Sequence, residues 1–131
     1  MVIIDTTVWI DLFGGFANAE TRWLDAEVGK QRLGLTDVIL CEVLQGIRSD
    51  AQIKRVEREL LKCEIFATGG IEMALAAARN YRVLRKKGFT VRKTIDCWIA
   101  TFCLREAHSL LHRDRDFDVF EKALGLNVIH P

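Results

Sequence analysis

The sequence lacks the composition of a linker, because its 131 residues include a single proline and no Ser/Gly-rich stretch. It also lacks the length for two cores. Half of the residues are hydrophobic, which is enough apolar material for one compact core and too little for a second. We therefore expect residues 1–131 to form a single domain.

An excess of charge of one sign is missing as well, since 19 Lys and Arg face 18 Asp and Glu. No global basic field then attracts nucleic acid, and any such binding must be local. The main local excess consists of Arg79, Arg82, Arg85, Lys86, Lys87, Arg92 and Lys93. Three of these, Arg79, Arg82 and Lys86, have the spacing of one helix face. The stretch would either hold RNA phosphates or form an ordinary solvated surface, and both interpretations stay open.

The four cysteines form no CxxC pair, and the three histidines are scattered. A structural zinc site needs four convergent soft ligands at characteristic spacing, so we expect buried reduced thiols instead. The N-terminus has no basic region before an apolar core, and Asp5 interrupts the only early hydrophobic run. We expect neither a signal peptide nor contact with a membrane, and hence a cytoplasmic protein.

Short apolar runs typical of strands alternate with segments of helical periodicity. We expect strands at 2–4, 33–35, 65–67, 109–111 and 127–129, and helices at 8–12, 17–28, 37–47, 50–62, 71–87, from 95 onward and after 118. The expected helix caps are Thr6 or Thr7, Thr36 or Asp37, Thr94 and Asp118. This alternation predicts an α/β sandwich with a mainly parallel sheet.

Acidic residues follow the predicted strands, where a doubly wound sheet forms its active-site crevice. Asp5 follows the first strand, and Asp114 and Asp116 follow the strand at 109–111. Asp96 opens a helix, whose positive end tolerates an anion, and Glu42 lies on a helix beside an apolar face. Each residue alone has an ordinary structural explanation, but together they could converge on one crevice.

Four stretches carry a resemblance to the PIN-domain family, and to its VapC-like toxins in particular. They are I-I-D-T-T-V-W at 3–9, E-V-L-Q-G at 42–46, T-I-D-C-W-I-A at 94–100 and L-L-H-R-D-R-D-F at 110–117. The resemblance extends from about Val2 to Ile129. It implies a three-layer α/β/α sandwich with a central mainly parallel sheet, metal-dependent endoribonuclease activity and control by a cognate VapB-like antitoxin.

The resemblance also implies which residues carry the chemistry. The catalytic and metal-binding positions of the family fall on Asp5, Glu42, Asp96 and Asp114, with Asp116 as a further ligand or a partner of a metal-bound water. We expect Asp5 and Asp96 to be principal ligands, Asp114 to matter more than Asp116, and Glu42 to bind the metal or to orient the attacking water. Thr7 matches a small polar position of the family that follows its first aspartate.

Such a group of carboxylates repels itself and a polyanionic substrate unless something positive compensates. Within these motifs the sequence offers only Arg113 and Arg115 as positive residues. We therefore expect one or two hard divalent cations with oxygen ligands, Mg²⁺ or Mn²⁺.

Two other functions also fit part of the sequence pattern. A strand ending in D-x-T also resembles the nucleophile loop of a haloacid-dehalogenase-type phosphatase, with Asp5 phosphorylated, but that family leaves Glu42 without a role. A non-catalytic PIN-like binding module would ordinarily have lost some acidic positions, and here all four are present. The intact set favours catalysis on RNA.

The resemblance implies assembly as well. We expect a homodimer, for which the apolar residues Trp9, Phe13 and Phe16 are candidates. We also expect an antitoxin segment with a basic residue to enter a groove beside residues 6–13 and 37–47, next to Asp5 and Glu42.

Overall fold

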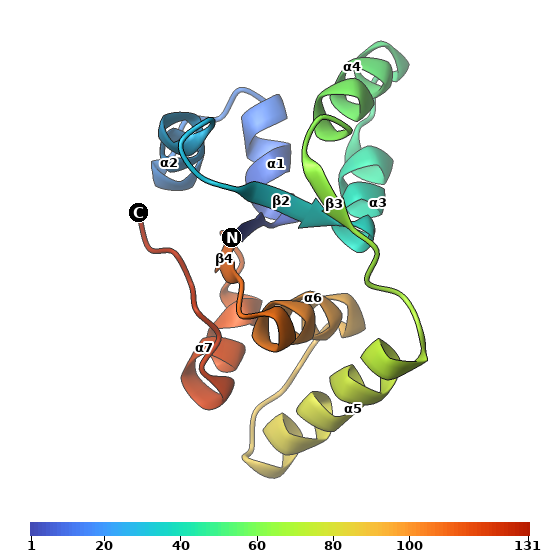
Figure 1. Cartoon of the computed structure of the whole chain (residues 1–131), viewed down its shortest axis with the longest axis vertical. Helices are drawn as coiled ribbons and strands as arrows, with labels where there is room; N and C mark the ends of the chain where they lie inside the picture. Colours follow the sequence, from blue (N-terminus) through green and yellow to red (C-terminus); the bar gives the residue numbers. More distant parts are fainter.

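The computed structural model describes residues 1–131, and a four-stranded sheet lies at its centre (Figure 1). The strands are β1 (Val2–Ile4), β2 (Leu33–Thr36), β3 (Glu64–Phe66) and β4 (Ser109–Leu111), in the order β3-β2-β1-β4. Every neighbouring pair is parallel, and Ile3 lies opposite Gly34 on one side and Leu110 on the other. The prediction of a mainly parallel sheet is confirmed.

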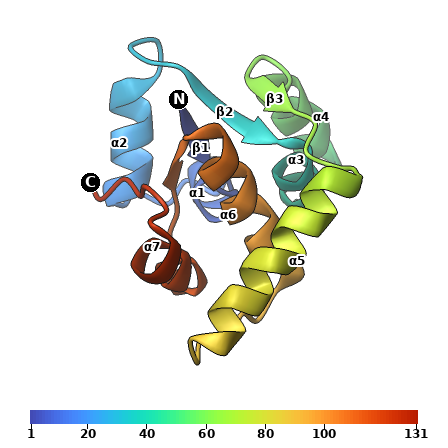
Figure 2. The same ribbon diagram turned by 60° about the horizontal axis from the view of Figure 1, so that its bottom comes forward.

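Helices cover both faces of this sheet (Figures 1 and 2). On one side lie α1 (Thr6–Phe13), α2 (Ala19–Glu27), α3 (Asp37–Gly46) and α4 (Asp50–Leu60). On the other side lie α5 (Ile71–Lys86), α6 (Thr94–Glu106) and α7 (Asp118–Leu124), the last preceded by the 3₁₀ turn η1 (Arg115–Phe117). These are the three layers of the predicted α/β/α sandwich.

The core forms where the two helix layers meet the sheet. Val2, Ile3 and Ile4 are all buried, as expected of a strand covered on both faces. Gly34 lets β2 approach β3, because a Cβ atom there would lie 2.7 Å from the carbonyl oxygen of Glu64. None of the helices combines the length and the apolar character needed to cross a bilayer.

Three of the predicted helix caps differ from those observed. The first helix is capped by Asp5 rather than by Thr6 or Thr7, since the Asp5 carboxylate accepts a hydrogen bond from the Thr7 backbone N–H at 3.0 Å. Helix α6 begins at Thr94 itself, with Lys93 in the capping position. Asp118 is likewise the first residue of α7, whose start follows directly from η1 without a side-chain cap. The prediction for α3 was right, with Thr36 as the cap.

Two further expectations need correction. Residues 127–129 form a single bridge from Val128 to Leu110 rather than a strand. All four cysteines are free, as expected, but only Cys97 and Cys103 are buried, and Cys41 is exposed. The expected set of buried thiols therefore covers only half of the cysteines.

Candidate active site

The acidic residues gather where β1 and β4 lie side by side. After β1 the chain enters the layer of α1, and after β4 it enters the opposite layer through η1. Neighbouring parallel strands whose following helices diverge in this way leave a crevice at their carboxyl ends. The backbone N–H of Asp5 donates to the carbonyl oxygen of Leu111 at 2.9 Å, which places Asp5 directly beside the loop that follows β4.

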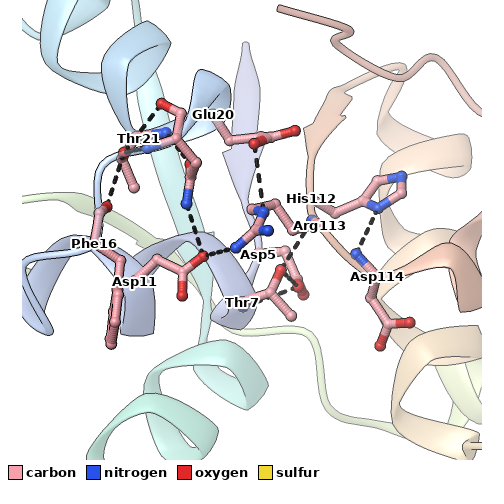
Figure 3. A network of polar contacts seen from close by, with 10 residues as sticks. Asp5, Thr7, Asp11, Phe16, Glu20, Thr21, His112, Arg113 and Asp114 are labelled. Carbon is pink, nitrogen blue, oxygen red and sulfur yellow. Dashed lines mark hydrogen bonds and ion pairs between the residues drawn. The ribbon is translucent and has the colours of Figure 1, made fainter.

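Asp5 is held rigidly at the end of β1, with only 3% of its surface exposed. Its Oδ2 accepts hydrogen bonds from the Thr7 hydroxyl at 2.6 Å and from the Thr7 backbone N–H (Figure 3). Burial raises the pKa of Asp5, and the charge of Asp114 adds to this, while the bonds from Thr7 oppose it. The fixed carboxylate therefore carries a charge that its surroundings compensate only in part.

Asp96 lies in the first turn of α6 and is 6% exposed. Its Oδ2 is buried without a hydrogen-bond partner, and the nearest cation, the Nζ of Lys93, is 4.0 Å away. Burial raises the pKa of Asp96 to about 7 against the opposing effect of Lys93, and the charges of Asp5, Asp114 and Glu42 raise it further. A buried carboxylate oxygen without a partner is costly in its ionised form unless a cation lies beside it.

Asp114 and Asp116 lie in the segment after β4. One carboxylate oxygen from each lies within 4.8 Å of the other and of one from Asp96. The Asp116 backbone N–H donates to Asp114 Oδ1 at 2.9 Å. Burial alone would raise the pKa of Asp114, but this bond and Lys93 outweigh it and hold the pKa below its ordinary value. The structure thus places Asp116, like the favoured Asp114, within 4.8 Å of Asp96.

Glu42 reaches the crevice from α3, where the Thr6 hydroxyl donates to its Oε1 at 2.8 Å. Burial raises the pKa of Glu42, and the charges of Asp5 and Asp114 add to this, although the Thr6 bond opposes it. Glu42 and Asp5 are not members of the group of three defined by Asp96, Asp114 and Asp116. Asp5 and Glu42 lie beside this group of three, close enough for their charges to raise the pKa of Asp96.

Sequence reasoning missed Lys93 as part of the site. The expectation that only Arg113 and Arg115 accompany the motifs was wrong, because Lys93 Nζ lies 3.3 Å from Asp114 Oδ2. Asp96 and Asp114 raise the pKa of Lys93 in return. The spacing of Lys93 and Asp96, three residues apart at a helix start, was the available signal. Arg113 instead points its guanidinium away, toward Asp11 and Glu20 (Figure 3).

His112 supports the loop from behind. Its Nδ1 accepts a hydrogen bond from the Asp114 backbone N–H at 3.1 Å, and its ring packs against Phe117 at 4.9 Å between centroids. Burial lowers the pKa of His112, which favours the neutral ring that this bond requires. The ring is occupied in holding the backbone of Asp114.

Comparison with known proteins agrees with this geometry. Residues 2–123 match the family described as PIN domain. The chain belongs to the PIN-domain family. A VapC ribonuclease from Mycobacterium bovis and Ribonuclease VapC11 from Mycobacterium tuberculosis are each 33% identical to this PIN-domain chain over 131 residues, covering 98% of it and 97% of the relative. The family inferred from the four motifs is confirmed.

Solved structures share the fold of this PIN domain. VapBC2 from Rickettsia felis, bound to a DNA fragment from its promoter, matches with a TM-score of 0.78 at 15% identity, over 98% of both chains. VapBC-1 from nontypeable Haemophilus influenzae matches with a TM-score of 0.74 at 18% identity, over 98% of this chain and 97% of the other. At such low identity the likeness concerns the fold alone.

The acidic crevice of this PIN domain fits a divalent cation. The unpartnered Oδ2 of Asp96 is a buried oxygen that lacks a positive neighbour within hydrogen-bond distance. The group of three offers only carboxylate oxygens, the donors that hard cations prefer. Asp96, Asp114 and Asp116 are therefore placed to hold such an ion.

Proposed function

We propose that this chain is a metal-dependent endoribonuclease and the toxin of a VapBC-like toxin–antitoxin pair. The observation that carries the proposal is the buried, unpartnered oxygen of Asp96, surrounded by four other carboxylates at the sheet's crevice. Relatives named VapC ribonuclease, aligned over nearly the whole chain, support the reaction and the substrate class. The expected ion is Mg²⁺ or Mn²⁺, because the donors are hard oxygens.

Each acidic residue has its own role in the proposed reaction. Asp96, Asp114 and Asp116 would hold the ion, and Asp5, fixed at the strand end by Thr7, would be a further catalytic ligand. When bound, the cation offsets the charge of the scissile phosphate and acidifies a water molecule. Glu42, oriented by Thr6, would add a ligand or align the attacking water. The water oxygen bonds to phosphorus and gives up a proton, one P–O ester bond breaks, and the departing oxygen takes up a proton from solvent.

The geometry disfavours the phosphatase alternative. A phosphorylated aspartate must present a free oxygen to the substrate. Asp5 is 3% exposed, and its Oδ2 already accepts two hydrogen bonds from Thr7. A ligand role suits this fixed carboxylate better than a nucleophilic one.

The proposed partners are an RNA substrate, a VapB-like antitoxin and a second copy of the chain, all in the cytoplasm. The antitoxin is supported by the similar VapBC structures.

The surface predicted for the homodimer needs correction, because Trp9 is buried and its Nε1 donates to the carbonyl oxygen of Ile4. Phe16 is 65% exposed, and Ile71 on α5 is 79% exposed. A monomer mass by light scattering at working concentrations would contradict the dimer.

Removal of ligand charge tests the nuclease. We expect Asp5→Asn and Asp96→Asn to abolish cleavage of a single-stranded oligoribonucleotide, and chelation of divalent ions to abolish it in the unchanged chain. Asp25→Asn is the matched control, since Asp25 is exposed on α2, outside the crevice. Circular dichroism of each variant verifies the fold. Cleavage that persists at the parent rate in either variant, or under full chelation, would refute the mechanism.

A further inference from the structure

The loop that carries Asp114 is tied to α1 and α2 by its neighbour, Arg113 (Figure 3). The Arg113 guanidinium forms an ion pair through Nη1 with Asp11 of α1, and its Nε lies 3.5 Å from Glu20 Oε2 of α2. Asn18, which caps α2, donates from Nδ2 to Asp11 Oδ2 at 3.0 Å. One arginine on the β4 side therefore meets two carboxylates on the β1 side, and these belong to two different helices.

The backbone of Arg113 makes a second connection, this time to the site itself. Its N–H donates to the Thr7 hydroxyl at 3.0 Å, and that hydroxyl donates its proton to Asp5 Oδ2 at 2.6 Å. The hydrogen bonds thus run in one direction, from the loop through Thr7 to the carboxylate. The next residue along the loop is Asp114, so the segment held by Arg113 fixes one acidic residue and orients another.

We propose that Arg113 is a positioning residue for the acidic site, and that its clamp on Asp11 and Glu20 sets the placement of Asp114 relative to Asp5. The inference rests on the proposed function, because it concerns the ligands of that same site. An ion pair that is partly exposed contributes little to overall stability. Its loss acts on the metal ligands through the loop, since supporting residues commonly tune metal affinity and activity strongly.

The test compares Arg113→Ala with Arg115→Ala. Arg115 lies two residues along the same segment, is exposed, and forms no ion pair. Titration of the purified chain with Mn²⁺ in a calorimeter, without RNA, reports the affinity of the ligands. We expect Arg113→Ala to weaken Mn²⁺ binding by about 10- to 100-fold and Arg115→Ala to match the parent.

Kinetics on a fluorescent single-stranded oligoribonucleotide give the second readout. We expect Arg113→Ala to lower kcat with KM nearly unchanged, and Arg113→Lys to recover part of the loss, because a lysine supplies the charge without the planar fork. Asp11→Asn added to Arg113→Ala should cost little more than Arg113→Ala alone, since the ion pair that Asp11→Asn breaks is already absent in that variant.

Three results would overturn the inference. The first is an Arg113→Ala chain that matches Arg115→Ala in Mn²⁺ affinity and kcat. The second is an Arg113→Ala chain with a raised KM but unchanged Mn²⁺ affinity and kcat, which would make Arg113 a direct contact to RNA. The third is full additivity with Asp11→Asn. A parent chain that binds Mn²⁺ but cleaves no RNA would contradict the proposed function, while the calorimetry would still decide the role of Arg113.

Discussion

Asp96 shows how burial and neighbouring negative charge together destabilise an ionised carboxylate in this site. It is buried, its Oδ2 has no hydrogen-bond partner, and other carboxylates lie close by. Lys93 relieves part of this repulsion from 4.0 Å, at the exposed rim. Burial and the neighbouring carboxylates outweigh Lys93 and raise the pKa of Asp96 to about 7, which favours the protonated acid in the metal-free chain.

This conflict predicts how the stability of the metal-free chain depends on pH. The pKa of Asp96 is raised from 3.8 to about 7, so between these values the folded chain binds a proton that the unfolded chain has lost. The free energy of unfolding should therefore fall as pH rises through this window, by a few kcal/mol at about 1.4 kcal/mol per pKa unit. Urea unfolding at pH 5 and pH 8 with chelator measures the loss.

Asp96→Asn is the control for this dependence, because an amide does not titrate. The variant should lose less stability between the two pH values than the parent chain, although Asp5 and Glu42, whose pKa values burial also raises, still contribute to the loss. Added Mg²⁺ should restore the parent at pH 8, since an ion that binds only the folded state stabilises it. Parent and variant chains with the same pH slope would contradict the assignment to Asp96.

For single residues, the sequence predicted which residue types form the site better than it predicted where their side chains point. Asp5, Asp96, Asp114 and Asp116 could be named as candidates because a charge after a buried strand or at a helix start has a recognisable pattern, whereas the family resemblance was needed to give Glu42, in the middle of α3, a role. Lys93 and Arg113 could not be assigned correctly, because both are long and flexible. Which carboxylate each one meets depends on loops far apart in the chain: Arg113 meets Asp11 and Glu20, which precede it by about a hundred residues.

Among the elements, α5 is the one on which we expect RNA to bind. Arg82, Arg85 and Lys86 line a hollow of about 410 Å³ that contains no apolar side chain. Arg82 also lines a second hollow with Thr94, and Thr94 lines a third with Glu42. The basic hollow is therefore separated from the hollow beside Glu42 by a mostly apolar one, which Arg82 and Thr94 border. Arg79 lies apart from it, in a hollow shared with Arg105.

We expect Arg82→Ala combined with Lys86→Ala to raise KM for RNA with kcat unchanged, because these residues contact phosphates away from the reacting bond. The salt dependence of binding should become shallower by about 0.7 in log–log slope for each lost contact with a single strand. The same charge removed from α4, as Arg55→Ala with Arg58→Ala, is the control. Equal effects of the two pairs would leave α5 an ordinary solvated helix.

Element positions followed from periodicity, whereas their ends did not. Core-facing spacing located every helix, but the caps depended on atoms that the pattern does not include. Asp5 caps α1 because β1 ends there and the chain turns at once, which leaves its carboxylate over the Thr7 N–H. Residues 127–129 have strand composition, yet pairing also needs a partner, and they meet the three-residue β4 only at Leu110.

For the whole molecule, the strand order brings the functional motifs together. Four motifs spread from residue 3 to residue 117 meet only because β4 returns beside β1. Local patterns contain no information about this order, so the positions at strand ends gave convergence on one crevice only as a possibility, which the family resemblance then supported. The same arrangement opens a hollow of about 360 Å³ next to Glu42, between α3 and α6. The groove predicted beside residues 6–13 and 37–47 therefore has its α3 wall, with α6 rather than α1 opposite.

This hollow is where we expect an antitoxin to restrain the enzyme. Val38, Ile95 and Trp98 give it an apolar lining, and Glu42 gives it a negative end. A flexible segment could fill it with apolar side chains while an arginine or lysine neutralises the carboxylates in place of the metal. Expression of this chain alone should then arrest growth, and both Asp5→Asn and co-expression of a cognate VapB-like protein should relieve the arrest, as colony counts after induction would report. If the unchanged and Asp5→Asn chains prove equally harmless at equal expression, the toxin role is wrong, although the nuclease activity measured in vitro would stand.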